Sequence, residues 1–413
     1  MKRLRYLADL NPSVPARIRR CDSELPLYSM DAIHEFSTPS EPELRPVGDL
    51  LSGYSYLEPS DVAYAKVTPC FENGKGLVGA DLESPSFATT EITVLRPRTG
   101  TDGRFLAWLL QSDAFRRPAI ASMTGAGGLK RVSEALMRDL PLPAPAIETQ
   151  HATADYLDHE TAEIDALVTE LIRFEDVLTE RLTSRHSALF GNAVTGDRPF
   201  ALLGELTERD WRAGKEFSND PLLSVSIERG VQVRTSDTTN QAASEDLSKY
   251  KRAFRGDIVI NRMRAFQGAL GASATTGLVS PDYAVLHPVG SSDSRYLAEL
   301  MRSAPFVFEM TKRLRGIGGS DSSSVRTPRI AVHDLLRIGV ALPPADTQIS
   351  ILEHWESALR STTSTRTDLT RAIDLAKERR AALITAAVTG QIDVTAKHRP
   401  AAEQLEDDIK ELS

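Results

Sequence analysis

Two long stretches of the chain repeat apolar residues in alternating steps of three and four. The first runs over residues 147–196, contains no proline, and keeps the pattern for about five heptads. We call the helix face formed by these repeated positions the seam. Its residues are Ala154, Leu157, Thr161, Ile164, Val168, Leu171, Leu178, Leu182 and Leu189, with Glu175 and Arg185 as charged interruptions. At about 1.5 Å per residue, this helix would be roughly 60 Å long, which predicts a rod.

The second stretch, residues 347–387, has seam positions Leu352, Trp355, Leu359, Leu369, Ile373, Ala376, Leu383 and Ala387. Thr362 and Arg366 interrupt it within a Ser/Thr-rich segment of modest helix propensity, which predicts the weakest part of the second rod. Both stretches end in Val-Thr-Gly. We therefore expect Gly196 and Gly390 to cap the helices in the left-handed conformation.

Shorter and more mixed patterns fill the rest of the chain. Residues 61–67 (DVAYAKV) and 91–95 (EITVL) are typical of strands. Residues 105–111 (FLAWLLQ) predict a helix whose start is marked by Thr101 and Asp102. Residues 140–145 (LPLPAP) predict a stiff, extended linker into the first rod.

The same order of patterns occurs twice. Residues 61–67 match 257–263 (DIVINRM), and residues 104–112 (RFLAWLLQS) match 295–303 (RYLAELMRS). GAGG at 125–128 corresponds in sequence to GIGG at 316–319, and Thr149–Gln150 recurs as Thr347–Gln348. Because the offsets drift by only a few residues, the pattern indicates two copies of a domain-plus-helix unit.

These patterns predict an α+β protein in which two α/β domains form a tandem pseudo-repeat. A long helix follows each domain, and the two helices could pair their seams in an antiparallel coiled coil. The predicted segments are a first domain (1–146), a first spacer helix (147–196), a second domain (197–345), a second spacer helix (346–394) and an acidic C-terminal tail (395–413).

Composition narrows the class of protein. The chain has 413 residues, of which 41% are hydrophobic and 26% charged, as in soluble globular proteins of two or three domains. It contains no run of 18 apolar residues and no apolar signal-peptide region, so we expect a cytoplasmic protein without a membrane partner. Cys21 and Cys70 stand alone and are expected to be reduced thiols.

The sequence offers no constellation for catalysis. GKGLVG at residues 74–79 fits a dinucleotide-binding spacing, but a polar, proline-containing segment follows it instead of a helix. No phosphate-binding G-x-x-x-x-G-K-[ST] loop, no Asn/Asp-Pro-Pro-Tyr motif and no zinc-type histidine spacing occurs. We therefore predict no catalytic residue and no metal ligand.

Local basic groups point instead to DNA. The net charge of −8 argues against unspecific coating of nucleic acid, but residues 249–264 (KYKRAFRGDIVINRMR) carry six basic residues and one acidic residue, with aromatics between them. Lys, Arg, Asn and Gln on loops suit phosphate and base-edge contacts. The candidates are Lys66, Thr68, Asn73, Lys75, Lys130 and Arg131 in copy one, and Asn261, Arg262, Arg264, Gln267, Lys312 and Arg315 in copy two.

The charge of the first rod favours a spacer. Between Glu148 and Arg185 the sequence holds ten carboxylates and three arginines, so this helix should stand off the phosphate backbone. The second rod is nearly balanced in charge.

Several of these motifs together resemble the DNA-specificity subunit of type I restriction–modification systems, over nearly the whole chain. They are KVTPCFENGK (66–75), the proline-rich entries followed by Thr-Gln, YLDHETAEIDALV (156–168) and KERRAALITAAVTGQIDV (377–394), echoed by SRHSALFGNAVTG (184–196). The first copy has His186 where the second has Arg380.

The resemblance implies two target-recognition domains, each reading half of a split site in double-stranded DNA. It also implies a subunit without its own cofactor, since two methyltransferase and two restriction/translocase subunits would use S-adenosylmethionine, ATP and Mg²⁺. Two other classes stay open: a DNA-binding enzyme with a diverged nuclease site, and a coiled-coil scaffold without a DNA role. DNA cleavage that depends on a divalent metal would favour the first, and partner binding without a DNA footprint would favour the second.

Overall fold

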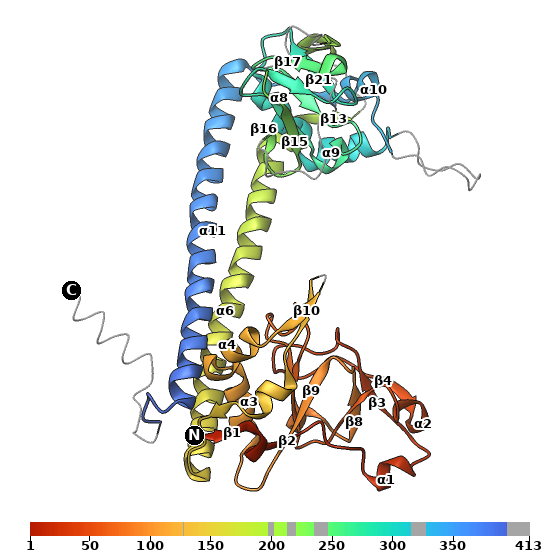
Figure 1. The fold of residues 1–413 in the computed structure, drawn as a ribbon. Coiled ribbons are helices and arrows are strands. Elements are labelled where there is room, and N and C mark those ends of the chain that lie inside the picture. Colours follow the sequence, from red (N-terminus) through yellow and green to blue (C-terminus); the bar gives the residue numbers. More distant parts are fainter. Residues whose placement is uncertain (127, 197–201, 213–219, 235–246, 315–327, 395–413) are drawn as a thin grey trace, which may run out of the picture. The chain divides into compact units, whose positions relative to one another are not determined.

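The computed structural model describes residues 1–126, 128–196, 202–212, 220–234, 247–314 and 328–394, and it divides into two compact units. Unit 1 comprises Met1–Ile172 and Thr370–Ser413, and unit 2 comprises Arg173–Leu369. The long helices α6 (Ile147–Phe190) and α11 (Ala345–Val388) both cross the division. Each unit therefore contains one α/β domain and a part of each long helix (Figure 1).

Unit 1 is built on two four-stranded sheets. The first has the order β2-β9-β6-β7 and is antiparallel throughout; the second has the order β4-β3-β8-β5, with β3 and β8 parallel. The strands are β1 (Lys2–Arg3), β2 (Ala8–Leu10), β3 (Glu24–Tyr28), β4 (Glu43–Pro46), β5 (Ser55–Leu57), β6 (Val62–Ala65), β7 (Gly76–Val78), β8 (Ser86–Ala88), β9 (Ile92–Pro97), β10 (Thr124–Ala126), β11 (Leu129–Arg131) and β12 (Pro141–Leu142). The helices are η1 (Leu4–Tyr6), α1 (Ala16–Arg19), α2 (Val47–Leu50), η2 (Gly79–Asp81), α3 (Gly103–Gln111), α4 (Asp113–Ala121) and α5 (Glu134–Arg138).

The core of unit 1 joins its sheet to the long helices through α3. Tyr64 of β6, Phe105 of α3, Leu157 of α6 and Ile384 of α11 belong to one cluster of buried apolar side chains. The predicted strands and the predicted helix of this region are confirmed as β6, β9 and α3. Asp102 caps α3 as expected, because its carboxylate accepts a hydrogen bond of 2.8 Å from the Phe105 amide.

Unit 2 repeats the first of the two four-stranded sheets of unit 1. Its antiparallel sheet has the order β14-β21-β18-β19, which matches β2-β9-β6-β7 strand for strand. The strands are β13 (Val194–Gly196), β14 (Leu206–Glu208), β15 (Leu223–Ser226), β16 (Gly230–Val233), β17 (Lys251–Ala253), β18 (Ile258–Ile260), β19 (Leu270–Ala272), β20 (Gly277–Val279), β21 (Ala284–Pro288) and β22 (Gly339–Val340). The helices are η3 (Gly191–Ala193), α7 (Leu202–Glu205), η4 (Leu247–Lys249), η5 (Ala265–Gln267), α8 (Ser294–Arg302), α9 (Ala304–Thr311) and α10 (Val332–Leu336).

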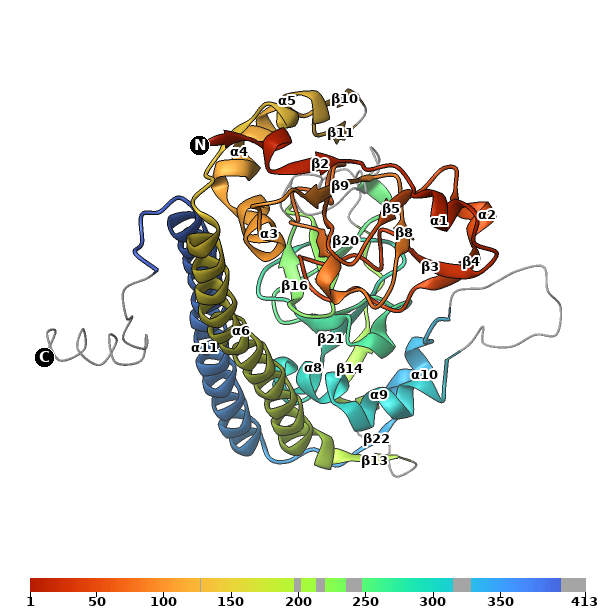
Figure 2. The ribbon, with the colours of Figure 1, turned by 90° about the horizontal axis from the view of Figure 1, so that it is seen from below.

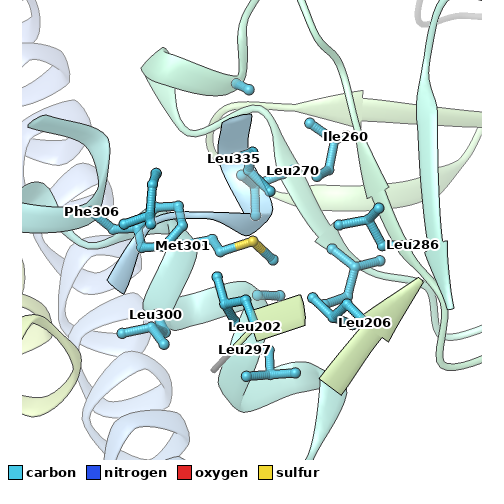
Figure 3. Close-up of a cluster of buried hydrophobic side chains, with 14 of the residues drawn as sticks. Leu202, Leu206, Ile260, Leu270, Leu286, Leu297, Leu300, Met301, Phe306 and Leu335 are labelled. Atoms are coloured by element: carbon cyan, nitrogen blue, oxygen red, sulfur yellow. The ribbon is translucent and has the colours of Figure 1, made fainter. Parts of the chain in front are cut away.

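The core of unit 2 lies between α8 and this sheet. Figure 3 shows Leu297 and Met301 of α8 facing Leu286 and Leu206 of the sheet, with Leu335 of α10 closing the cluster. These five side chains are at most 2% exposed. Fully burying one aliphatic side chain of this kind contributes about 1.5–3 kcal/mol.

A buried glutamine ties each domain to the start of a long helix. In unit 1, Gln150 Oε1 accepts from the Asp102 amide at 2.9 Å, and Gln150 Nε2 donates to the carbonyls of Gly100 (3.1 Å) and Pro145 (2.9 Å). In unit 2, Gln348 Oε1 accepts from the Asp293 amide at 3.0 Å, and its Nε2 donates to Ser292 Oγ and the Pro343 carbonyl. The repeated Thr-Gln motif thus has a structural role in both units.

The seam of the first helix is confirmed as its less exposed face. Ala154, Leu157 and Thr161 are buried and the later seam positions are half-buried, whereas Leu167 outside the seam is 53% exposed. In the second helix most seam positions are likewise shielded, but Leu359 is 41% exposed. The helix continues unbroken through its Ser/Thr-rich segment.

The two helices contact each other inside each unit. In unit 1, Arg380 Nε lies 3.0 Å from Asp165 Oδ1. In unit 2, Arg366 Nη2 lies 3.1 Å from Glu175 Oε1, and Trp355 packs edge-on against Phe190. The charged interruptions Glu175 and Arg366 are therefore partners.

One predicted helix end is wrong. The first helix ends at Phe190, and Val194–Gly196 form β13, which pairs with β22 through Val194 and Val340. Gly191 stands at this break, where an added Cβ would come within 2.8 Å of the Pro305 ring. In the second copy the prediction is confirmed, because Gly390 follows α11 with a φ of +72°.

The predicted linker is more than a spacer. Residues 141–142 form β12, which pairs antiparallel with β1. The linker thus joins the chain's first strand to the start of α6. The predicted acidic tail, residues 395–413, lies outside the described residues.

Candidate nucleic-acid interface

The predicted contacts at the end of β6 differ in how far they reach solvent. Lys66 follows the strand, and its ammonium lies 3.3 Å from Glu134 Oε1. Lys75 donates from Nζ to the Met30 carbonyl at 2.8 Å, which holds the loop that follows β3. Asn73 lies between them in an exposed turn. Of these three side chains, Asn73 is the most accessible to a ligand.

Thr68 supports a neighbouring β-ribbon formed by β10 and β11. Its hydroxyl donates to the Gly128 carbonyl and accepts from the Lys130 amide, both at 2.9 Å, and its own amide donates to the Lys130 carbonyl. The side chain is therefore buried within unit 1 instead of facing a ligand. Gly125 allows the two strands of the ribbon to approach, because a Cβ there would lie 2.1 Å from the Leu129 carbonyl oxygen.

The ribbon presents two of the predicted cations. Lys130 is exposed, whereas Arg131 forms a bidentate pair with Glu91, with Nε–Oε2 and Nη2–Oε1 distances of 2.9 and 2.7 Å. The hydrogen bond from Arg131 holds the pKa of Glu91 below its ordinary value. Figure 2 shows the ribbon next to α5 at the edge of unit 1.

In unit 2 the predicted residues Asn261, Arg262, Arg264 and Gln267 share one loop after β18. Asn261 is buried and accepts from the Met263 amide at 3.2 Å, so it shapes the loop. Arg264 and Gln267 are exposed, and Arg262 is half-buried with Nε 3.4 Å from the Ile330 carbonyl. The outward-facing residues of this loop are thus Arg264 and Gln267.

The two candidate clusters occupy equivalent places. The Lys66 carbonyl accepts from the Val132 amide at 2.8 Å, and the Arg262 carbonyl accepts from the Ile330 amide at 3.2 Å. Each cluster therefore lies at the end of the equivalent strand, β6 or β18. In each unit this strand end is hydrogen-bonded to the segment that follows α4 or α9.

Lys312 lies at the end of α9, apart from the loop after β18 in sequence. Its ammonium is 2.7 Å from Glu309 Oε1 and 4.2 Å from the centre of the Phe308 ring. Hydrogen bonds from Lys312 and then Arg313 lower the pKa of Glu309. Arg315 and the GIGG loop lie outside the described residues.

Unit 2 also carries an aromatic and cationic cluster that the candidate residues did not include. The rings of Trp211 and Phe254 stack with centroids 5.2 Å apart and an interplanar angle of 9°. Arg252 lies over both rings, and Arg209 lies 4.9 Å from the centre of Phe254. The alternation of basic and aromatic residues at 249–264 was the sequence signal that could have indicated this cluster. Trp211 lies outside that segment, so its part in the cluster had no signal there.

Part of the acidity of α6 is neutralised within the units. Arg104 of α3 binds both Asp155 and Asp158 at 2.8 and 2.9 Å. Asp165 pairs with Arg380. The acidic surface predicted from composition is therefore smaller than the count of carboxylates suggested.

Two kinds of feature are absent from the described residues. These residues contain no group of three or more His, Cys, Asp or Glu side chains arranged to hold a metal ion. Within them, no helix combines the length and the apolar character needed to cross a bilayer.

The architecture defines an HsdS-like fold, a mixed α/β protein with two long helices. The HsdS subunit from Thermoanaerobacter tengcongensis superposes with a TM-score of 0.56 at 16% identity, covering 94% of this chain and 96% of that one. A chain from a structure described as the basis of complex assembly and conformational transition of the type I R-M system gives a TM-score of 0.65 at 15% identity, with the same coverage.

Sequence comparison points to the same group of proteins. The chain is 31% identical over 154 residues to the specificity subunit of the type I restriction enzyme EcoAI from Escherichia coli, and 28% identical over 145 residues to that of EcoEI. These alignments cover 36% and 34% of this chain but only 25% and 24% of the relatives' lengths. No family model matches the chain. The resemblance to type I specificity subunits is thus confirmed.

Proposed function

We propose that this protein is the DNA sequence-specificity subunit of a type I restriction–modification complex. The observation that carries the proposal is its sequence similarity to two specificity subunits, together with a duplicated architecture of the HsdS type. In each unit, the loop after the equivalent strand, β6 or β18, carries cations and side-chain amides, which suit contact with phosphates and base edges.

The two domains are proposed to read the two halves of a split, asymmetric DNA site. The exposed polar side chains of the two equivalent loops differ: Asn73 in copy one, and Arg264 and Gln267 in copy two. Different side chains on one scaffold favour the reading of different bases. The halves would lie on successive major-groove faces, roughly 34 Å apart.

We further propose that α6 and α11 form an antiparallel coiled coil that sets the distance between the halves. The shielded seam of α6 and the ion pairs Arg380–Asp165 and Arg366–Glu175 support this pairing. The helix surface left exposed would receive partner subunits.

The chain is proposed to act without chemistry of its own. Two methyltransferase subunits would modify adenine with S-adenosylmethionine, and two restriction/translocase subunits would use ATP and Mg²⁺. This chain would direct the methyltransferase and the restriction/translocase subunits to the recognised DNA sequence.

A map of modified bases in the host genome tests the function. If the proposal holds, the genome carries adenine methylation at a bipartite motif, and deletion of this gene alone removes it. A complemented strain restores the same motif. An unchanged map in a strain with an active neighbouring methyltransferase would refute the proposal.

A further inference from the structure

Unit 1 contains a cleft that Lys66 lines together with residues outside the candidate set. Its volume is about 380 Å³, within the range of about 300–1,000 Å³ typical of small-ligand clefts. Its polar lining includes Asn11, Ser13, Arg19, Tyr54, Lys66 and Thr90. Among the described residues that line it there are two cations, several hydroxyls and no carboxylate, although the chain carries a net charge of −8.

One wall of the cleft is rigidly built. Asn11 adopts a left-handed conformation with φ of +47°, and its amide donates to the Val94 carbonyl at 2.7 Å. Its side-chain oxygen accepts from the Val94 amide at 2.9 Å, and its side-chain nitrogen donates to Glu134 at 3.0 Å. These bonds fix the loop that follows β2.

The two cations of the cleft keep donors available for an anion. Lys66 lies 3.3 Å from Glu134, and this contact uses one of the three ammonium protons. Arg19 donates from Nε to the Val14 carbonyl at 2.9 Å, which orients the guanidinium. Arg19 and Lys66 therefore each retain N–H donors that suit a phosphate oxygen.

Two of the residues that line the cleft are linked to the basic ribbon. Thr90 lines the cleft, and the next residue, Glu91, holds Arg131 of β11. The Glu91 carbonyl also accepts from the Lys66 amide at 2.8 Å. The ribbon is therefore attached to unit 1 beside Lys66, one of the residues that line the cleft.

We infer that this cleft binds a phosphate of a DNA strand together with its sugar. The inference rests on the proposed function and adds a site to it. Paired cations and hydroxyls without a lining carboxylate match the chemistry of a nucleotide phosphate. A strand phosphate is favoured over a free nucleotide because the cleft adjoins the ribbon and its exposed Lys130.

The equivalent place in unit 2 is built differently. The Arg209 amide donates to the Val285 carbonyl at 2.8 Å, as the Asn11 amide does to Val94. Two residues further on, unit 2 has Trp211 where unit 1 has Ser13, and the indole stacks on Phe254. The phosphate contact is therefore assigned to the first copy.

The test measures DNA affinity of the complex purified through a tag on this chain, at several salt concentrations. Arg19→Gln and Lys66→Met remove the cations, and Ser13→Trp places the residue of unit 2 in the cleft. Arg45→Gln is the control, because Arg45 is an exposed cation of the same domain that pairs with Glu43. Thermal unfolding of each variant checks that it is folded, and Arg19→Gln leaves Glu134 untouched.

The first two variants should weaken binding to specific and unspecific duplexes alike and leave the recognised sequence unchanged. Each lost phosphate contact should lower the slope of log K against log salt by about 0.9. Ser13→Trp should weaken binding in the same way, whereas Arg45→Gln should not.

Two outcomes would overturn the inference while leaving the proposed function intact. In the first, the wild-type complex binds a split site and the three cleft variants behave like Arg45→Gln. In the second, calorimetry with free deoxyadenosine monophosphate shows saturable binding that the variants lose while DNA affinity is unchanged. Absence of specific DNA binding by the wild-type complex would instead reject the proposed function.

Discussion

Glu175 and Arg366 form an ion pair across the two long helices in unit 2, with Oε1–Nη2 and Oε1–Nε distances of 3.1 and 3.2 Å. Each residue is a charged interruption in the apolar seam of its own helix. A charge in a seam is costly unless a partner meets it, so each interruption explains the other. The pair also favours one register, because a shift of one turn would separate the two charges.

Single substitutions of this pair should cost more than the double substitution. Glu175→Leu or Arg366→Leu leaves one charge without its partner in the seam, whereas the double variant supplies two apolar side chains. Since the side chains are 30% and 49% exposed, we expect a coupling free energy of about 0.5–1 kcal/mol. Urea unfolding of the four proteins measures it, and additive single effects would rule out the coupling.

Replacing the buried Gln150 of unit 1 by alanine should lower the free energy of unfolding. Gln150→Ala leaves the Asp102 amide and the Gly100 and Pro145 carbonyls without their partner. Gly100 is exposed and Asp102 and Pro145 are half-buried, so water can replace part of these bonds, and we expect a loss of about 1 kcal/mol. Urea unfolding should show this loss, and Gln348→Ala should produce a similar one in unit 2. Gln111→Ala is the control, since among the described residues the Gln111 side chain bonds to the Ala107 carbonyl of its own helix.

The local patterns predicted much of this fold. Residues 61–67 and 105–111 carry their own strand and helix signals, and the seams predicted both rods, because these features depend on neighbours in sequence. The end of the first helix was missed because Val194 of β13 pairs with Val340 of β22, 146 residues further along the chain, and no local pattern encodes such a pairing. The role of Thr68 was missed for the same reason: its partners, Gly128 and Lys130, are distant in sequence.

Thr68 should affect DNA binding through the ribbon. Thr68→Val keeps the shape of the side chain and removes the hydroxyl, so the Lys130 amide and the Gly128 carbonyl lose a partner. We expect faster hydrogen exchange at the Lys130 amide and weaker DNA binding together. Thr68→Ser retains the hydroxyl and should restore both. Loss of binding without any change in exchange would indicate a direct contact instead.

Low pH should weaken the ion pair between Glu91 and Arg131 that holds the ribbon. Arg131 lowers the pKa of Glu91, so the pair stabilises the fold fully above the ordinary value of 4.5 and loses this effect as pH falls through the lower folded-state pKa. Glu91→Gln should therefore be less stable than the wild type at pH 7, and the difference should shrink below pH 4.5. Urea midpoints across this range measure it; a difference that does not change with pH would contradict the assignment.

The proposed spacer can be tested by lengthening both helices together. One heptad added to α6 within residues 154–189, with a matching heptad in α11, keeps the seams in register and adds about 10.5 Å, or about three base pairs. The methylated motif should keep both halves and gain spacer between them. A heptad added to α6 alone should destabilise the protein, because it shifts Glu175 relative to Arg366. If the matched insertion changed the identity of a half-site while the spacer stayed constant, the helices would not set the distance.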